Sequence, residues 1–353
     1  MARVASELHA QGTAVEVWSV DRGASPCAEG PIPVRYLPTP LPARSPASAA
    51  RFTARVPAAW SGWRRAVRDF RPNILHVHCF GPNGVYARAL HRRFGTALIV
   101  TSHGETLADD TGAFSRSALL RGELRRALSS ADVVTAPSDF VLRDLRAHYG
   151  LTDGRIVPNG VDLDVAPSES VPVDPPYLFA VGRLGHMKGF DLLVDAFAAA
   201  ELDPGIRLII GGDGAERGEL ERRIARRGLE SRVSLRGWMD TDEVAAAMSS
   251  ALAVVVPSRA EAFGIVALEA WRSGAPLIMT NRGGAGEFIH DGTDGMLVDP
   301  TDTAALARVL ERVASLDAAA RSELTAAGRD RVVAFSWARV ADAYARIYAE
   351  ILG

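Results

Sequence analysis

The chain has 353 residues, of which 48% are hydrophobic and 23% are charged, and its formal net charge is −2. The length exceeds what one hydrophobic core usually serves and predicts two domains, while the composition excludes a disordered chain and the charge excludes a basic nucleic-acid-binding protein. Two cysteines exclude a disulfide framework, and we expect a cytoplasmic protein because the sequence shows neither a long apolar run nor a signal-peptide pattern.

The chain opens with a helical pattern over residues 2–12, whereas a doubly wound domain normally opens with a strand and a glycine-rich turn. We therefore expect the first strand of the N-terminal domain to be missing. Short β-branched runs then alternate with amphipathic stretches, which is typical of a parallel sheet. The predicted strands of the first half are 15–20, 34–37, 74–78, 98–103, 133–138 and 155–160.

Two segments of the first half invite other interpretations. Residues 23–48 are rich in proline and predict an extended surface segment. Residues 51–72 carry six arginines, one acid, Trp60 and Trp63, a pattern that could lie on anionic lipid. We favour an ordinary helix that covers the sheet with its arginines outward, so peripheral membrane contact is possible but not favoured.

The second half repeats the alternation after a linker, residues 166–176, which contains four prolines and no apolar periodicity. We therefore predict an N-terminal domain over 1–165, a C-terminal domain over 177–335 and a last helix over 336–353, with Ser336 as its N-cap, that crosses back to the first domain. The predicted strands of the second half are 177–183, 208–214, 233–238, 252–258, 276–281 and 295–300.

One lysine, Lys188, stands among 40 basic residues, and the other 39 are arginines. Lysine is a compact point charge, so a close-fitting phosphate contact is one place where arginine cannot replace it. Lys188 and Arg183 share the segment GRLGHMKG, which follows a predicted strand at the edge where parallel sheets bind ligands. Two cations beside free backbone amides predict a clamp for a diphosphate.

The segment RAEAFGIVALEAWRSG follows the fourth strand of the second half. Glu261 lies in its loop, Gly264 brings the backbone close, and a helix from about Ile265 carries Glu269 in its second turn. Carboxylates accept hydrogen bonds from hydroxyls but repel phosphate, so they favour a ligand that joins phosphate to polyol. From spacing alone, an acid of the helix N-terminal turn and a solvated residue of the helix face stay open as the alternative.

The motifs GRLGHMKG, GGDG, EAFGIVALE and NRGGAGEFIHDGTDGMLVDP, in this order and spacing, resemble the donor domain of the retaining family-4 glycosyltransferases. The likeness covers residues 177–300 closely and 70–165 moderately. It implies the GT-B fold, in which two Rossmann-like, doubly wound α/β domains with parallel sheets face a central cleft.

The resemblance also implies roles for individual residues. Arg183 and Lys188 would bind the donor diphosphate and offset charge on the leaving group, and Glu261 would contact hydroxyls of the transferred sugar. Glu269 would bind the nucleotide ribose, and His103, in the motif TSHGE, would reach toward the donor sugar and phosphate. The catalytic set is thus His103, Glu261, Arg183 and Lys188. The remaining donor contacts, largely through backbone atoms, would come from Gly182, Gly212, Trp238, Met239, Phe263, Gly264 and Ile265.

His76 and His78 alternate across one predicted strand, and we interpret them as packing or cleft-lining residues rather than metal ligands. No Asp-rich metal motif is present, and the resemblance implies that the clamp residues make a metal or other cofactor unnecessary.

The implied reaction moves a hexosyl unit from a nucleotide-diphosphate sugar, UDP favoured over GDP, to a small-molecule or lipid-linked acceptor with retention of configuration. The Arg- and Ala-rich composition suggests a bacterial source. Two alternatives stay open. One is a pseudo-glycosyltransferase that couples a nucleotide-activated cyclitol, and the other is a truncated, catalytically weak binding or partner subunit. The pattern indicates neither the acceptor nor the oligomeric state.

Overall fold

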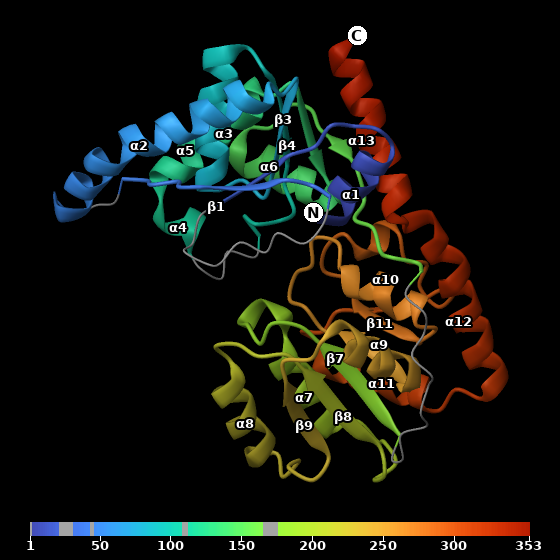
Figure 1. The fold of residues 1–353 in the computed structure, drawn as a ribbon. Coiled ribbons are helices and arrows are strands. Elements are labelled where there is room, and N and C mark those ends of the chain that lie inside the picture. The colour runs from blue at the N-terminus through green and yellow to red at the C-terminus, as the bar shows by residue number, and fades with distance from the viewer. Residues whose placement is uncertain (1, 21–30, 43–45, 108–111, 165–175) are drawn as a thin grey trace. The chain divides into compact units, whose positions relative to one another are not determined.

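The computed structural model describes residues 2–20, 31–42, 46–107, 112–164 and 176–353 (Figure 1). The chain divides into two compact units, one formed by 1–158 and 337–353 and the other by 159–336. Each unit contains a parallel β-sheet with helices, which confirms the predicted class of two α/β domains with parallel sheets.

The boundary between the units lies earlier than the predicted residue 165. The Val161 amide donates a hydrogen bond of 2.8 Å to the Phe335 carbonyl, and Val161 pairs with Ser336 as an isolated parallel bridge. These contacts place the segment around Val161 in the second unit. The predicted linker, 166–176, lies outside the described residues except for Pro176.

The first unit begins with α1 (Ala2–Ala10), so a helix precedes the first strand, as predicted. Its strands form a two-stranded sheet, β1-β2, and a four-stranded sheet, β3-β4-β5-β6, and all pairs are parallel. All six predicted strands are present, but the sixth is short and ends before Val157 and Pro158. The remaining elements are β1 (Val17–Val20), β2 (Val34–Leu37), α2 (Pro46–Phe70), β3 (Ile74–His78), α3 (Pro82–Phe94), β4 (Ala97–Thr101), α4 (Ala113–Arg116), α5 (Ala118–Ser130), β5 (Val133–Ala136), α6 (Asp139–Tyr149) and β6 (Arg155–Ile156).

Helix α2 confirms the helical interpretation of the arginine-rich segment and begins at Pro46, inside the range predicted to be extended. Trp63 is buried, its indole Nε1 donates to the Pro38 carbonyl at 2.9 Å, and its ring stacks on Tyr86. Arg55 and Arg65 are exposed. The apolar face of the helix is thus used for packing inside its own unit.

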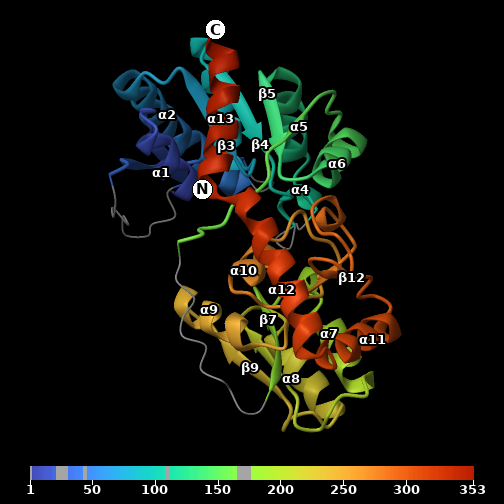
Figure 2. The ribbon, with the colours of Figure 1, turned by 90° about the vertical axis from the view of Figure 1, so that its right-hand side faces the viewer.

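The last helix, α13 (Trp337–Leu352), belongs to the first unit, where it packs beside α1 (Figure 2). Val4 and Leu8 of α1 join Tyr344 and Ile347 of α13 in one buried apolar cluster. Apolar residues three and four positions apart on each helix share a face, which explains why both helices bury one side.

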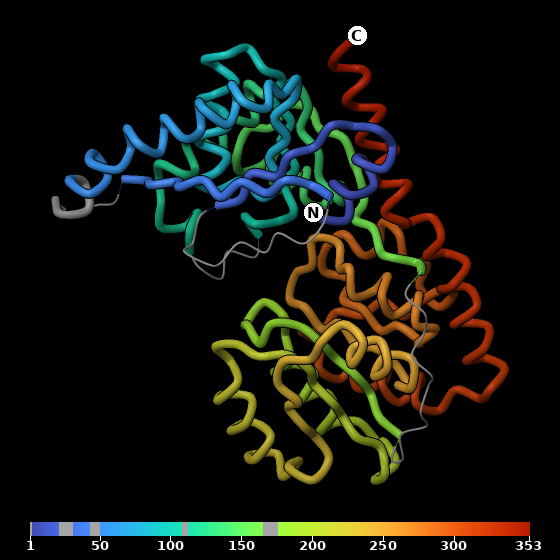
Figure 3. The backbone as a smooth tube through the Cα atoms, in the orientation of Figure 1, coloured from blue at the N-terminus to red at the C-terminus, as the bar shows by residue number. Residues whose placement is uncertain are grey.

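The second unit contains one six-stranded sheet in the order β12-β11-β10-β7-β8-β9, and every pair is parallel. Figure 3 traces the chain through this unit, from green at β7 to red at α12. All six predicted strands are present. The elements are β7 (Tyr177–Val181), η1 (His186–Lys188), α7 (Phe190–Ala199), β8 (Arg207–Gly211), α8 (Arg217–Arg226), β9 (Val233–Gly237), α9 (Thr241–Ser250), β10 (Ala253–Val256), α10 (Ile265–Arg272), β11 (Leu277–Thr280), η2 (Ala285–Glu287), β12 (Met296–Val298), α11 (Thr303–Ala314), α12 (Ala318–Val332) and η3 (Val333–Phe335).

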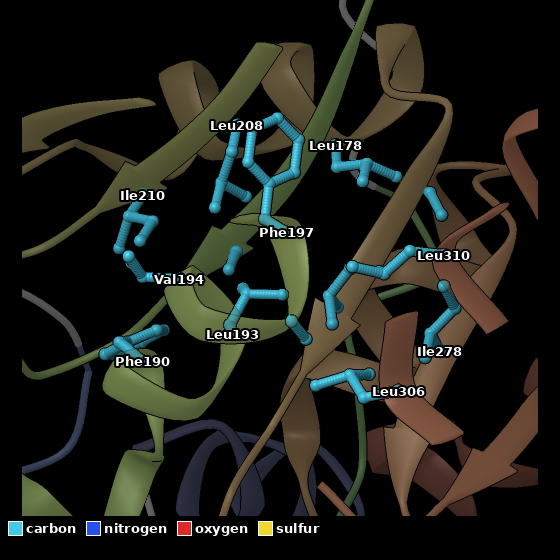
Figure 4. Packing of buried hydrophobic residues seen from close by; sticks show 14 of the residues in the cluster. Leu178, Phe190, Leu193, Val194, Phe197, Leu208, Ile210, Ile278, Leu306 and Leu310 are labelled. Atoms are coloured by element: carbon cyan, nitrogen blue, oxygen red, sulfur yellow. The ribbon is translucent and has the colours of Figure 1, made fainter. Parts of the chain in front are cut away.

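The core of the second unit forms where helices α7 and α11 pack on the sheet (Figure 4). Leu193 and Phe197 of α7 are fully buried beside Leu208 and Ile278 of the strands. A strand buried on both faces needs continuous apolar sequence, which is the pattern of LIIG and LIMT. This rigid layer carries the loops at the carboxyl ends of the strands.

Gly212 allows the ends of β7 and β8 to touch. Its φ is +115°, and a Cβ there would lie 2.0 Å from the Gly182 carbonyl oxygen. We expect Gly212→Ala to lower the free energy of unfolding by more than about 1 kcal/mol, because backbone atoms cannot yield as a flexible side chain does. Urea unfolding measures the change.

Gly218, in α8, is the matched control because a Cβ there would meet nothing within 4 Å. Gly218→Ala should raise the unfolding free energy by up to about 1 kcal/mol, since alanine favours a helix. Equal effects of the two substitutions would contradict the close-approach argument.

Candidate functional site

The strand order of the second unit creates a switch point at β7. The chain builds β8 and β9 on one side of β7 and then places β10 on its other side. The loops that follow β7 and β10 therefore start from adjacent strands and run in opposite directions along the sheet. Open parallel sheets bind ligands at such a point. The predicted clamp and the predicted first carboxylate lie in these two loops.

Lys188 and Glu261 meet across the switch point. The Lys188 Nζ lies 2.8 Å from Glu261 Oε2, which also accepts a hydrogen bond of 3.0 Å from the Ser258 hydroxyl. The side chains are 34% and 13% exposed, so this pair faces solvent on one side only. Among the described residues, no partner is recorded for Oε1 of Glu261, so this oxygen can accept a ligand hydroxyl.

The backbone of Glu261 is held by the loop that follows β11. The Glu261 amide donates to the Arg282 carbonyl, and the Gly284 amide donates to the Glu261 carbonyl, both at 3.0 Å. A Cβ at Gly283 would lie 2.0 Å from the Glu261 carbonyl oxygen. Glycine at position 283 thus permits the pairing that fixes this carboxylate.

Helix α10 begins at Ile265, as predicted, with Gly264 at its N-cap in a left-handed conformation. The first amides of a helix have no partner within it and carry partial positive charge, so they can face phosphate oxygens. The Phe263 ring is buried and stacks on Phe288 with ring centroids 4.4 Å apart. Only backbone atoms of Phe263 therefore remain for a ligand.

Glu269, in the second turn of α10, is partly buried. Burial raises the pKa of its carboxyl, and the nearby Arg272 acts in the opposite direction. Within the described part of the chain, no hydrogen bond or ion pair to this carboxylate is recorded. A partly buried carboxylate can accept hydrogen bonds from both hydroxyls of a vicinal diol.

The strand ends next to β7 carry the other predicted donor contacts. Gly182 follows β7, and the Gly212 amide donates to the Gly237 carbonyl at 2.6 Å. Trp238 is 79% exposed, while the sulfur of Met239 covers Gly211. Arg183 is exposed in the loop after β7. The structure thus gathers the predicted donor residues of the second unit at one edge of its sheet.

Two residues of this edge were not predicted from the sequence. Arg259 donates hydrogen bonds from Nη1 and Nη2 to the two carboxylate oxygens of Asp191, at 2.8 and 2.6 Å. Although burial opposes it, the hydrogen bonds from Arg259 hold the pKa of the Asp191 carboxyl below its usual value. The partners are 68 positions apart, so no local pattern joins them.

His103 follows β4 in the first unit, where its Nε2 lies 3.2 Å from Nδ1 of His78. The relation of His103 to the donor residues of the second unit stays a prediction. His76 and His78 lie on one face of β3, with ring centroids 3.9 Å apart. The interpretation that they alternate across the strand is wrong, because residues two apart share a face.

These imidazoles are kept neutral by their surroundings. Burial lowers the pKa of His76 to about 3, with a smaller effect from His103. Burial, His76 and His103 together hold the pKa of His78 well below its usual value. His76 Nδ1 contacts the Tyr348 hydroxyl and its Nε2 contacts Thr101 Oγ1, both at 2.7 Å. The histidines therefore pack as a hydrogen-bonded cluster inside the first unit.

Metal-binding clusters and membrane-spanning helices are both absent from the part of the chain that the structure describes. Over the described ranges, no group of three or more His, Cys, Asp and Glu side chains could hold a metal ion. Over the same ranges, none of the helices combines the length and apolar character that crossing a bilayer requires.

The sequence matches two family models along most of its length. Residues 164–331 match the model described as glycosyl transferases group 1, and residues 1–165 match the one described as glycosyltransferase family 4. The chain is 32% identical to a D-inositol 3-phosphate glycosyltransferase of Nocardiopsis dassonvillei, over 81% of this chain and 73% of that protein. It is 31% identical to a glycogen synthase of Mycobacterium tuberculosis, over 80% and 69% of the two chains.

Solved structures show the same fold. A sucrose-phosphate synthase of Thermosynechococcus elongatus has a TM-score of 0.85 and 25% identity, with 99% of this chain and 92% of that chain covered. HepE of Anabaena, solved in complex with UDP-glucose, has a TM-score of 0.72 and 20% identity, with 90% and 86% covered.

The buried histidines predict a loss of stability in acid. His76 stays neutral in the folded unit down to a pH of about 3, whereas in the unfolded chain it binds a proton below its ordinary value of 6.5. The unfolded state therefore binds more protons in this window. The contribution of His76 to the stability of the folded state is complete above pH 6.5 and declines as the pH falls toward about 3. One such histidine contributes a slope of up to about 1.4 kcal/mol per pH unit.

Urea unfolding at a series of pH values measures this slope. In His76→Asn the free energy of unfolding should fall less steeply between pH 6 and 4 than in the unmodified chain. Identical slopes would show that His76 is not the group that stays unprotonated.

Proposed function

We propose that this chain, which belongs to the glycosyltransferases of group 1, family 4, transfers a hexosyl unit from a nucleotide-diphosphate sugar to an acceptor hydroxyl with retention of anomeric configuration. A UDP-sugar is favoured over a GDP-sugar. The observation that carries the proposal is the Lys188–Glu261 pair, 2.8 Å apart at the switch point of the parallel sheet. It sets a phosphate-binding cation beside a hydroxyl-binding acid.

Lys188, Arg183 and the N-terminus of α10 would bind the diphosphate. Lys188 and Arg183 lie in the loop after β7, and α10 begins at Ile265 with its first amides available. Negative charge grows on the diphosphate as the glycosidic bond breaks, so fixed positive charges stabilise the transition state more than the bound donor. These groups supply the charge that a metal would otherwise provide, and we propose a metal-independent reaction.

Glu261 and Glu269 would bind the hydroxyl groups of the donor, which lie on its sugar and its ribose. Oε1 of Glu261 would accept a hydroxyl of the transferred sugar, while Oε2 stays with Lys188 and Ser258. Glu269 would accept the ribose hydroxyls. The backbone around Gly212, Trp238 and Met239 would border the base, at the ends of β8 and β9.

We propose front-face attack as the mechanism. The acceptor oxygen bonds to the anomeric carbon while the bond from that carbon to the phosphate oxygen breaks on the same face. The leaving diphosphate oxygen takes the acceptor proton, so no protein nucleophile is needed. His103 would orient the donor sugar and phosphate, and its contact with His78 holds the ring in place. The protein then contributes positioning and electrostatics.

The comparisons support the donor class. HepE was solved with UDP-glucose, and the Nocardiopsis relative is named as a glycosyltransferase of D-inositol 3-phosphate, a small phosphorylated acceptor. We propose a small-molecule or lipid-linked acceptor for this chain. A cytoplasmic location is also proposed, and the free thiol of Cys79 fits a reducing compartment.

Nucleotide release from a panel of donors tests the reaction. UDP-glucose, UDP-galactose, GDP-mannose and a nucleotide-activated cyclitol are incubated with a mixture of acceptors, and the product anomer is assigned by NMR. We expect release from a UDP-hexose and an unchanged anomeric configuration. Release only from the cyclitol donor would favour the pseudo-glycosyltransferase, and an inverted product would contradict the mechanism.

Lys188→Met tests the clamp. Removing a charge that acts mainly on the leaving group should lower kcat about a hundredfold or more. Lys188→Arg should not restore the rate, because a planar guanidinium does not fit the place of a compact ammonium. An unchanged kcat in Lys188→Met would contradict the proposed role.

Glu269→Gln tests the ribose contact. Losing one charge-assisted hydrogen bond should raise the KM for the donor about tenfold with little change in kcat, since ribose is held equally in the ground and transition states. Glu323→Gln, at an exposed position of α12, is the control and should leave both constants unchanged. A fall in kcat with constant KM would contradict a ribose contact.

A further inference from the structure

The turn that carries Lys188 is not anchored by burial of its own side chains. None of the three side chains of η1, His186–Lys188, is buried. A lysine on a loosely held turn would sample many positions, which would weaken any phosphate contact that depends on a fixed ammonium. Yet the Lys188 Nζ is placed 2.8 Å from Glu261 Oε2. Other contacts must therefore fix the turn.

Arg259 supplies those contacts. Its amide donates to the Met187 carbonyl at 2.9 Å, and its Nη1 donates to the His186 carbonyl at 2.7 Å. The same guanidinium pairs with both carboxylate oxygens of Asp191, near the start of α7. One residue thus binds the turn before Lys188 and the helix after it. The side chains of Arg259 and Asp191 are only 21% and 18% exposed.

Arg259 is itself held from the opposite side. Its carbonyl accepts a hydrogen bond of 3.0 Å from Nε of Arg282, and Arg282 pairs with Asp299 at 3.0 Å. The Arg282 carbonyl in turn accepts from the Glu261 amide. The loops after β7, β10 and β11 therefore form one connected hydrogen-bonded unit, with Arg259 at its centre.

We propose that Arg259 is a positioning residue for the second phosphate of the donor: paired with Asp191, it holds η1 so that Lys188 is preorganised for a diphosphate. This inference rests on the proposed function. Three of the five N–H donors of Arg259 are bound to the His186 carbonyl and to Asp191, so we assign Arg259 a role through Lys188 rather than as a phosphate ligand. Arginine suits this place because its planar fork matches a carboxylate with two parallel bonds.

Loss of the Arg259 contacts should affect one part of the nucleotide and spare the rest. The base and ribose contacts are proposed for the ends of β8 and β9 and for Glu269, and no recorded contact joins Arg259 to these. Removing the Arg259 guanidinium should therefore weaken the binding of a nucleoside diphosphate and leave the affinity for the monophosphate unchanged. A general loss of folding would weaken both.

Calorimetric titration with UDP and UMP tests this consequence in the full chain. In Arg259→Gln we expect the affinity for UDP to fall about tenfold, as for one charge-assisted contact, while that for UMP changes by less than about twofold. Arg259→Lys should lose UDP affinity similarly, because an ammonium cannot reproduce the fork. Asp191→Asn, which keeps the arginine, should show the same selective loss.

Arg227→Gln is the matched control, because Arg227 pairs with Asp195 at 3.0 Å on α7 but makes no contact with η1. It should leave both affinities unchanged. The combined variant Lys188→Met/Arg259→Gln should bind UDP no more weakly than Lys188→Met alone, since Arg259 acts through Lys188.

The outcomes separate the inference from the function on which it rests. If the unmodified chain binds none of UDP, GDP, ADP and dTDP, the proposed function fails. If a diphosphate other than UDP binds best, that diphosphate and its monophosphate take the place of UDP and UMP in the titrations. If the unmodified chain binds a nucleoside diphosphate and Arg259→Gln binds it equally well, only the inference fails. Equal losses of diphosphate and monophosphate, or additive losses in the combined variant, would also overturn it.

Discussion

Two loops at the edge of the second unit's sheet touch backbone to backbone, and the site depends on that contact. A Cβ at Gly189 would lie 2.0 Å from the Pro257 carbonyl oxygen, and Gly189 has a φ of +67°. Lys188 precedes this glycine, while Glu261 follows Pro257 in the other loop. The close approach therefore brings an ammonium and a carboxylate together without long, flexible connections. Glycine at this position is a requirement of geometry.

The fixed charges at this edge occur in compensating pairs. Lys188 lies against Glu261, and Arg259 lies against Asp191. Pairing lowers the cost of holding charges in a partly buried place. A bound diphosphate would add negative charge beside these pairs. Lys188, Arg183 and the start of α10 are the groups that the proposed site turns toward that charge.

The sequence predicted those features that depend on local pattern. The alternation of apolar runs predicted each strand of the described ranges, and the helix predicted from about Ile265 is α10. The predictions were weaker where distant residues decide the outcome. Arg259 and Asp191 meet only because β7 and β10 are neighbours, and the boundary near Val161 is set by Phe335. The face shared by His76 and His78 is predictable from strand geometry, because residues two apart on a strand point to the same side.

The first unit is assembled from segments that precede and follow the second unit in the sequence. Helix α13 packs on α1 through Tyr344 and Ile347, and Tyr348 bonds to His76 in β3. Translation produces α1 before the second unit and α13 after it. Val4 and Leu8 therefore gain their partners on α13 only after the whole second unit has been synthesised.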